Sequence, residues 1–213
     1  CFLREEEKML SWGKKKKPFR IIGLTGGIGS GKSAVAECLK KAGFSVINLD
    51  TLGRELSETS PEIHHAVEKA FGSQAVSPSG LNRQYLREVI FADSLSRQKL
   101  EAILHPIILK EFHRQAELMR KAGESVVICE AALLIESGTY QKLDALIVVL
   151  ASEATRLQRI QIRDGITEAL AKQMIQAQVT DDKRKSLATF TIENNSTLEE
   201  LEIKTRKLAE KLR

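Results

Sequence analysis

Short apolar runs alternate along the chain with longer stretches whose apolar residues recur at helical spacing. The first helical stretch, residues 32–43, follows the first apolar run after a glycine-rich loop and ends at Gly43, a residue that commonly stops a helix. A strand, a glycine-rich loop, a helix and a second strand in this order predict a βαβ unit with parallel strands. Apolar runs that predict strands occupy residues 19–25, 44–50, 125–134, 144–151 and 187–195.

A long helical region separates the second predicted strand from the third. Between about residues 52 and 122 the spacing of apolar residues favours helices throughout, and no segment there predicts a strand. Because this length exceeds an ordinary crossover connection, we expect an inserted helical subdomain, at about residues 53–122. Two charged helices at about residues 153–178 and a closing amphipathic helix at 197–213 complete an α/β domain of residues 19–213 with a five-stranded, mostly parallel sheet.

The loop after the first strand carries the clearest chemical motif. Residues 26–33, GGIGSGKS, match G-x-x-x-x-G-K-[ST], in which glycines let successive N–H groups turn toward one anion. The next helix adds its positive dipole end, Lys32 is expected to reach the β- and γ-phosphates, and the Ser33 hydroxyl to bind Mg²⁺. The predicted ATP-binding residues of this motif are Gly26, Gly27, Ile28, Gly29, Ser30, Gly31, Lys32 and Ser33.

Two carboxylates lie where predicted strands end. Asp50 ends the second strand, at the edge of a parallel sheet where ligands bind, so it can orient or deprotonate an attacking hydroxyl group or hold Mg²⁺ through water. A helix N-cap is the alternative role for Asp50, and it is compatible with the first. Glu130 ends the third strand; it either acts on metal-bound water or is a solvated or capping residue.

Three arginines lie on one face of the first charged helix. Arg156, Arg159 and Arg163 are spaced i, i+3 and i+7. Arginines on a mobile element can neutralise the charge that spreads over a transferring phosphoryl group, whereas the alternative is a solvated basic face. After a nucleotide-binding loop, we favour the first interpretation.

Histidines and cysteines show no spacing typical of metal ligands. His64, His65 and His113 are expected on helix surfaces, and His105, which precedes Pro106, in an extended or turn conformation at a helix start. The three cysteines lie far apart in the sequence, so we predict neither a disulfide framework nor a metal site and expect a cytoplasmic protein.

Net charge separates the first residues from the remainder. Residues 1–20 contain seven Lys or Arg and three Glu, a net charge of +4, and the remaining 193 residues carry a net charge of +1. Residues 1–18 are therefore expected to form a flexible basic tail, although a four-lysine run could contact RNA or a membrane surface. The apolar runs are too short to span a bilayer. We expect small-molecule substrates and neither nucleic acid nor membrane as a specific partner; the oligomeric state is left open.

Other motifs distinguish classes of nucleotide-binding proteins. The sequence has no N-K-x-D segment of the kind that reads guanine, and the run VICEAALL lacks the paired acids of motor and transport ATPases. A compact core, a helical insertion for the acceptor and an arginine-bearing lid together favour a small-molecule kinase, in which closure excludes water.

From about residue 21 onward the chain resembles the dephospho-CoA kinase family. The resemblance rests on IGLTGGIGSGKSAVA, VINLDTLGR, LNRQYLREVIF, LEAILHPII, AALLIES, TRLQRIQIRDG, IQAQ and TIENN, in this order. It implies a three-layer fold of the P-loop NTPase type and transfer of the ATP γ-phosphate to the ribose 3′-hydroxyl group of dephospho-CoA. It also implies ATP phosphates on Gly29 to Ala34, Asp50 as the base, Arg54 and His105 on the dephospho-CoA side, and Arg159 and Arg163 in the lid.

Four positions depart from the pattern typical of that family. Asn48 stands where an aspartate is usual, Ala132 where a proline is usual, Arg156 in place of a common lid glutamine, and Thr189 in place of a frequent aspartate. None of these changes removes a group that the chemistry requires. Two alternatives remain: another P-loop kinase that phosphorylates a nucleoside or nucleotide, and a nucleotide-binding regulatory or RNA-contacting protein that uses the lysine-rich tail.

Overall fold

A computed structural model describes residues 18–213, so the predicted basic tail lies outside the described residues except for Pro18. The five predicted strands form one sheet in the order β2-β5-β1-β6-β7, and every pairing within it is parallel. These strands are β1 (Arg20–Gly26), β2 (Ser45–Asn48), β5 (Val126–Glu130), β6 (Ala145–Leu150) and β7 (Phe190–Glu193).

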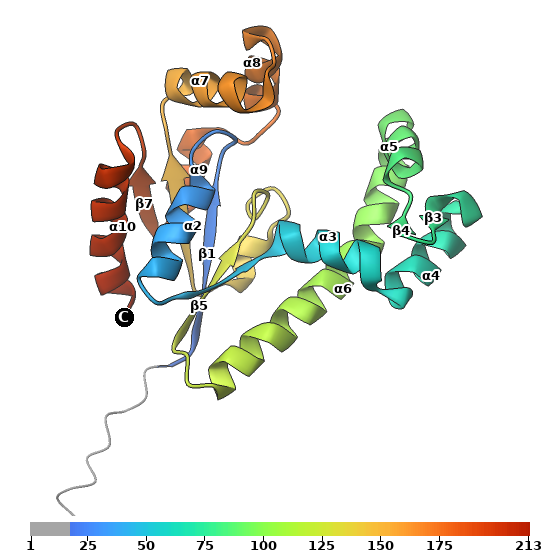
Figure 1. Cartoon of the computed structure of the whole chain (residues 1–213), viewed down its shortest axis with the longest axis horizontal. Coiled ribbons are helices and arrows are strands. Elements are labelled where there is room, and N and C mark those ends of the chain that lie inside the picture. Colours follow the sequence, from blue (N-terminus) through green and yellow to red (C-terminus); the bar gives the residue numbers. More distant parts are fainter. Residues whose placement is uncertain (1–17) are drawn as a thin grey trace, which may run out of the picture.

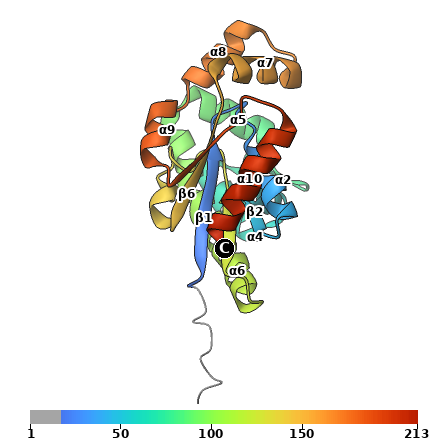
Figure 2. The same cartoon turned by 90° about the vertical axis from the view of Figure 1, so that its left-hand side faces the viewer.

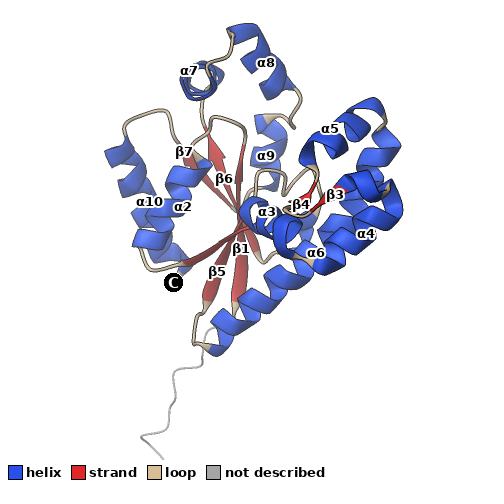
Figure 3. Ribbon diagram, turned by 45° about the vertical axis from the view of Figure 1, so that its right-hand side comes forward, coloured by secondary structure: helices blue, strands red, loops and turns tan. Residues whose placement is uncertain are grey.

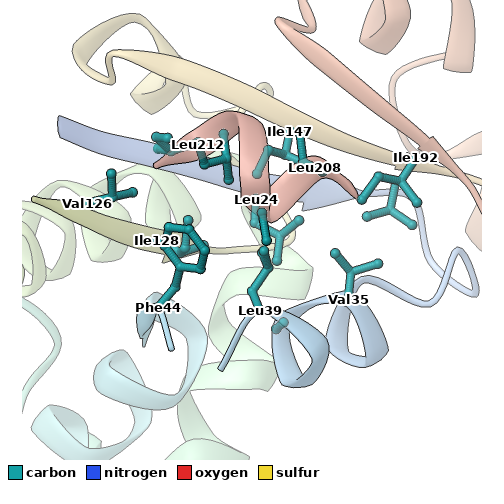
Figure 4. Close-up of a cluster of buried hydrophobic side chains, with 14 of the residues drawn as sticks. Leu24, Val35, Leu39, Phe44, Val126, Ile128, Ile147, Ile192, Leu208 and Leu212 are labelled. Atoms are coloured by element: carbon teal, nitrogen blue, oxygen red, sulfur yellow. The ribbon is translucent and has the colours of Figure 1, made fainter. Parts of the chain in front are cut away.

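Helices cover both faces of the sheet, which confirms the predicted three-layer α/β fold (Figure 1). Alternate strand residues point to opposite faces, so β1 sends Ile22 and Leu24 toward α2 (Lys32–Lys41) and α10 (Leu198–Leu212). Figure 4 shows Leu24 of β1 and Ile147 of β6 among side chains from both helices. The opposite face packs against α3 (Leu49–Thr59), α6 (Ser94–Lys121) and the end of α9 (Asp181–Leu187).

The segment between β2 and β5 is a helical body at one side of the sheet (Figure 3). It contains α3, α4 (Pro61–Phe71), α5 (Arg83–Ala92), the single 3₁₀ turn η1 (Ser73–Ala75) and α6, and it has its own core around Ile63, Val67 and Leu86. The prediction that this segment has no strand is wrong: β3 (Val76–Ser77) pairs antiparallel with β4 (Gly80–Leu81). Two-residue strands are too short to produce an alternating pattern in the sequence.

His105 and Pro106 lie inside α6, so the prediction of a helix start at this point is wrong. Proline has no N–H group and leaves one backbone carbonyl of the preceding turn without its helical partner. The helix continues because its two halves are held by packing: Leu100 is buried before the proline, and Phe112 and Ala116 are buried after it. Tertiary contacts therefore override the local preference of the His-Pro pair.

The two predicted charged helices stand above the carboxyl ends of the strands (Figures 1 and 2). They are α7 (Glu153–Asp164) and α8 (Glu168–Gln176), and the closing helix α10 begins after its cap Thr197. Helix α9, which the sequence did not predict, is the next helix after α8, and its end packs against the sheet. Within residues 18–213, no helix combines the length and apolar character needed to cross a membrane.

Candidate active site

The glycine-rich loop requires its glycines for geometric reasons. Gly29 and Gly31 have φ angles of 77° and 88°, in the left-handed region that side chains disfavour. A Cβ atom on Gly31 would lie 2.1 Å from Nδ2 of Asn194. Gly31 is also the N-cap of α2, so the loop leads directly into the positive end of that helix. The loop is therefore shaped to present backbone N–H groups to an anion.

Most of the predicted ATP-binding residues line one open cavity of about 520 Å³. Arg159 and Arg163 of α7 line the same cavity, as does Gln178. Ser30 does not, because its side chain is buried and its carbonyl oxygen accepts a hydrogen bond from Asn194 Nδ2 at 2.8 Å. The loop residues lining the cavity are Gly26, Gly27, Ile28, Gly29, Gly31, Lys32 and Ser33, and the predicted Ala34 lies in the first turn of α2.

Lys32 forms a buried ion pair beside this cavity. Its Nζ atom lies 2.7 Å from Oε1 of Glu130, whose side chain is 4% exposed. Glu130 is therefore neither a solvated residue nor a helix cap, and those two alternatives are wrong. Ser33 and Glu130 also line an adjoining cavity of about 440 Å³ between α2 and α3. The neighbouring thiol of Cys129 is no candidate nucleophile, because burial raises its pKa to about 12.

Side chains from the lid region hold both peptide groups of Ile28. Arg156 Nε donates to the Ile28 carbonyl oxygen at 2.8 Å, and the Ile28 N–H donates to Gln178 Oε1, also at 2.8 Å. Arg156 Nη1 lies 3.3 Å from Asp181 Oδ2. Burial lowers the pKa of Arg156, whose ion pair with Asp181 opposes that shift. Arg156 thus joins the loop to α7 and α9 and is no part of a solvated basic face.

The three arginines of α7 occupy three different environments. Arg156 is 4% exposed, Arg159 is half-buried with Nη1 3.4 Å from the carbonyl oxygens of Gly29 and Ser30, and Arg163 is exposed. The exposed Arg163 pairs with Asp164, Nε to Oδ1, at 2.8 Å. Helical spacing placed them on one side of α7, but only the packing of α7 against the loop gives them different environments.

Asp50 lies in the first turn of α3, not at the end of a strand. The N-cap of α3 is Asn48, whose side chain accepts a hydrogen bond from the Thr51 N–H at 2.8 Å, so the capping role considered for Asp50 is wrong. Asparagine caps helices as well as aspartate does, so Asn48 can cap α3 at the position where an aspartate is usual in the family that the sequence resembles. Asp50 Oδ2 accepts a hydrogen bond from the Ala132 N–H at 3.2 Å, a bond that a proline at position 132 could not donate.

A separate cavity of about 150 Å³, which we call the acceptor cavity, brings Asp50 and His105 together between α3, α6 and the loop after β5. Arg54 lies one helical turn after Asp50 on α3 and is exposed. Ala132 lines the cavity of the glycine-rich loop and donates to Asp50, so it lies where the two cavities approach each other. The remaining three histidines lie on α4 and α6, outside both cavities.

Sequence reasoning missed the residues that brace the loop. Asn194 directly follows β7 and Gln178 follows α8, and both were recognised only as members of the strings TIENN and IQAQ. A polar residue just after a buried parallel strand is a signal that could have identified Asn194. Thr189 has a structural role: its hydroxyl oxygen accepts a hydrogen bond from the Leu146 N–H at 3.0 Å, where β6 begins.

The chain is similar to known proteins in sequence and in structure. The family model described as dephospho-CoA kinase matches residues 20–200. A dephospho-CoA kinase of Geobacter sulfurreducens is 39% identical over 183 residues, covering 85% of this chain and 93% of the relative. A dephospho-CoA kinase of Xanthomonas euvesicatoria pv. vesicatoria is 43% identical over 192 residues, covering 88% of this chain and 93% of the relative. A crystal structure from Thermus thermophilus matches with a TM-score of 0.75 and 30% identity, covering 92% of this chain and all of the other.

Proposed function

The chain belongs to the dephospho-CoA kinase family, and on that premise we propose how its residues transfer the γ-phosphoryl group of ATP to the ribose 3′-hydroxyl group of dephospho-CoA. One observation carries the assignment of roles. Ala132 lines the cavity of the glycine-rich loop, and its N–H lies 3.2 Å from the Asp50 carboxylate. A phosphoryl donor in that cavity and an acceptor at Asp50 would therefore meet at Ala132.

The donor is held by the loop and by the lid. The N–H groups at the start of α2 take the ATP phosphates, and Lys32 supplies a positive charge at the β- and γ-phosphates. Arg159 and Arg163 line the same cavity as the loop and neutralise charge on the equatorial oxygens of the transferring group. Closure of α7 and α8 excludes water, which would otherwise accept the phosphoryl group.

Asp50 is the proposed general base. The 3′-hydroxyl oxygen forms the new bond to the γ-phosphorus, the bond from that phosphorus to the β–γ bridging oxygen breaks, and the hydroxyl proton passes to Asp50. ADP leaves with the bridging oxygen. Arg54 and His105, beside Asp50, are proposed to contact dephospho-CoA.

The residues at the start of α2 fit Mg²⁺ bound together with ATP. Within the described range 18–213, no three His, Cys, Asp or Glu side chains are grouped as metal ligands, and Mg²⁺ characteristically uses few protein ligands and substrate phosphates. The Ser33 hydroxyl is exposed in the loop cavity, so it would hold the ion. When bound, Mg²⁺ would neutralise charge on the β- and γ-phosphates. We further propose that the reaction takes place in the cytoplasm.

A substrate screen tests this assignment. We expect the chain, with ATP and Mg²⁺, to consume ATP with dephospho-CoA and to form a product phosphorylated at the ribose 3′ position. AMP and nucleosides serve as competing acceptors. Faster turnover with AMP or a nucleoside would instead establish a nucleotide or nucleoside kinase. Failure with every acceptor would favour a regulatory nucleotide-binding protein.

A further inference from the structure

An apolar groove of about 310 Å³ lies in the helical body, beyond the acceptor cavity. Ile90 and Phe91 of α5 and Leu100 and Leu104 of α6 line its walls, together with Arg83 and Arg87 of α5. Phe91 is 82% exposed, although burial of an aromatic ring is strongly favourable. The groove therefore offers apolar surface to a ligand, and nothing in the phosphoryl-transfer chemistry uses it.

Two helices connect this groove to the acceptor cavity. On α3, Asp50, Arg54 and Ser57 are spaced i, i+4 and i+7, so they share one face of the helix. Asp50 lines the acceptor cavity and Ser57 lines the groove, about 10 Å further along the helix axis at 1.5 Å per residue. Arg54 lies between them.

The second helix, α6, has the same arrangement. Leu100, Leu104 and Ile108 are spaced i, i+4 and i+8 along one face of α6. The first two line the groove and Ile108 lines the acceptor cavity together with its near neighbour His105. Both helices therefore run from the acceptor cavity to the groove, and an elongated ligand that follows the surface of α3 past Arg54 would reach the groove.

The order of these side chains matches the order of groups in dephospho-CoA. The substrate presents the ribose hydroxyl, then the 5′-diphosphate, then the pantetheine arm, which has a dimethyl-substituted carbon, two amides and a terminal thiol. The helices present the Asp50 carboxylate, then the Arg54 guanidinium, then the apolar groove. We propose that the groove between α5, α6 and the end of α3 binds the pantetheine arm, with its thiol end beside Phe91. This proposal rests on the proposed function.

A charge introduced at Phe91 tests the proposal, with Leu95 as the matched control. Leu95 is 70% exposed on the same helical body but does not line the groove. We expect Phe91→Glu to raise the KM for dephospho-CoA about tenfold with little change in kcat, because the arm loses apolar contact. The KM for AMP, which has no arm, should not change. Leu95→Glu should leave the KM of both acceptors unchanged.

Thiol tethering gives a second readout that does not depend on turnover. Dephospho-CoA activated as its 2-pyridyl disulfide should add one dephospho-CoA mass to Phe91→Cys much faster than to Leu95→Cys, and free dephospho-CoA should slow this reaction. The two described cysteines, Cys38 and Cys129, are buried, and the unmodified chain measures the background. The groove assignment alone would be overturned if the wild-type chain turns over dephospho-CoA but the substitutions at Phe91 and Leu95 have equal effects. In that case Phe91→Glu and Leu95→Glu would have the same KM for dephospho-CoA, and Phe91→Cys and Leu95→Cys would be labelled at the same rate. Absence of wild-type turnover with dephospho-CoA would overturn the proposed function.

Discussion

The nucleotide side and the acceptor side of the site are built differently. Side chains from the lid region and from the end of β7 hold the backbone of the glycine-rich loop at Ile28, Gly29 and Ser30. On the acceptor side, Asp50 is exposed and is held by the backbone N–H of Ala132. The proposed phosphate site is thus braced by several side chains, whereas one backbone N–H group positions the carboxylate of the proposed acceptor site.

This difference fits the demands of the two substrates. Stabilising charge that develops on a phosphoryl group requires donors that are already in place, because reorienting them during the reaction costs free energy. An acceptor hydroxyl requires one nearby base, and binding energy from the rest of the substrate can position it. Substitutions on the nucleotide side should therefore change stability and activity together, and those on the acceptor side should change activity alone.

The largest effect is expected at Lys32. Lys32→Ala should lower turnover roughly 10³-fold and reduce the free energy of unfolding by about 3 kcal/mol, because it removes the phosphate cation and leaves the Glu130 carboxylate buried without its partner. Steady-state kinetics and urea unfolding measure the two effects. Lys40→Ala is the control: its pair with Glu37 has the same 2.7 Å separation but is exposed, so its loss should cost less than about 1 kcal/mol. Equal stability losses in both variants would contradict the burial argument.

Asp50→Asn should lower turnover by roughly 10²-fold or more, because the amide cannot take the hydroxyl proton. Affinity for ATP and the free energy of unfolding should stay near the wild-type values, since Asp50 is exposed and asparagine can still accept from Ala132. Steady-state kinetics measure the turnover, calorimetry measures the affinity for ATP, and urea unfolding measures the stability. Asp93→Asn, at the exposed N-cap of α6, should preserve activity. Near-normal turnover of Asp50→Asn would refute the base assignment.

Gly31→Ala should lower the free energy of unfolding by about 2–3 kcal/mol and weaken ATP binding. A positive φ angle costs an alanine about 1 kcal/mol, and the new Cβ atom displaces Asn194 from its bond with Ser30. Gly123→Ala is the control. Gly123 has a φ angle of 99°, but a Cβ atom there would meet no other atom within 4 Å, so the free energy of unfolding should fall by only about 1 kcal/mol. Urea unfolding of both variants separates strain from steric conflict, and identical losses would show that Asn194 moves without cost.

The smallest effect is expected at Arg156. Arg156→Ala should raise the KM for ATP about tenfold, lower the free energy of unfolding by about 1–2 kcal/mol and leave the KM for dephospho-CoA unchanged, because it removes a buried guanidinium group and releases the Ile28 carbonyl on the nucleotide side alone. Arg156→Gln keeps an amide donor and should have a smaller effect. Parallel changes in both KM values would mean that the two sides are coupled through this arginine.

Predictions from the sequence succeeded where a local pattern has one structural solution. Five apolar runs formed five strands in one parallel sheet, and the glycine-rich motif lies at the carboxyl edge of that sheet. They failed where packing overrides local preference. Pro106 lies within α6, since buried residues on both sides of it hold the helix, and the strands β3 and β4 are too short to leave a pattern.

The site shows the same limit. The spacing of the arginines was visible in the sequence, but the burial of Arg156 and the bracing of the loop by Asn194 and Gln178 were not. These partners lie 128 to 164 residues away from the loop in sequence, so no window of local pattern contains both members of a contact.

The sequence by itself determined the sheet, the glycine-rich loop and the family, because each depends on residues that are neighbours along the chain or on the order of motifs. Only the tertiary structure decided that Lys32 pairs with Glu130 and that Ala132 donates to Asp50. These contacts join elements distant in the sequence, and each depends on the free energy of burying or satisfying a polar group, which is settled only when the layers pack.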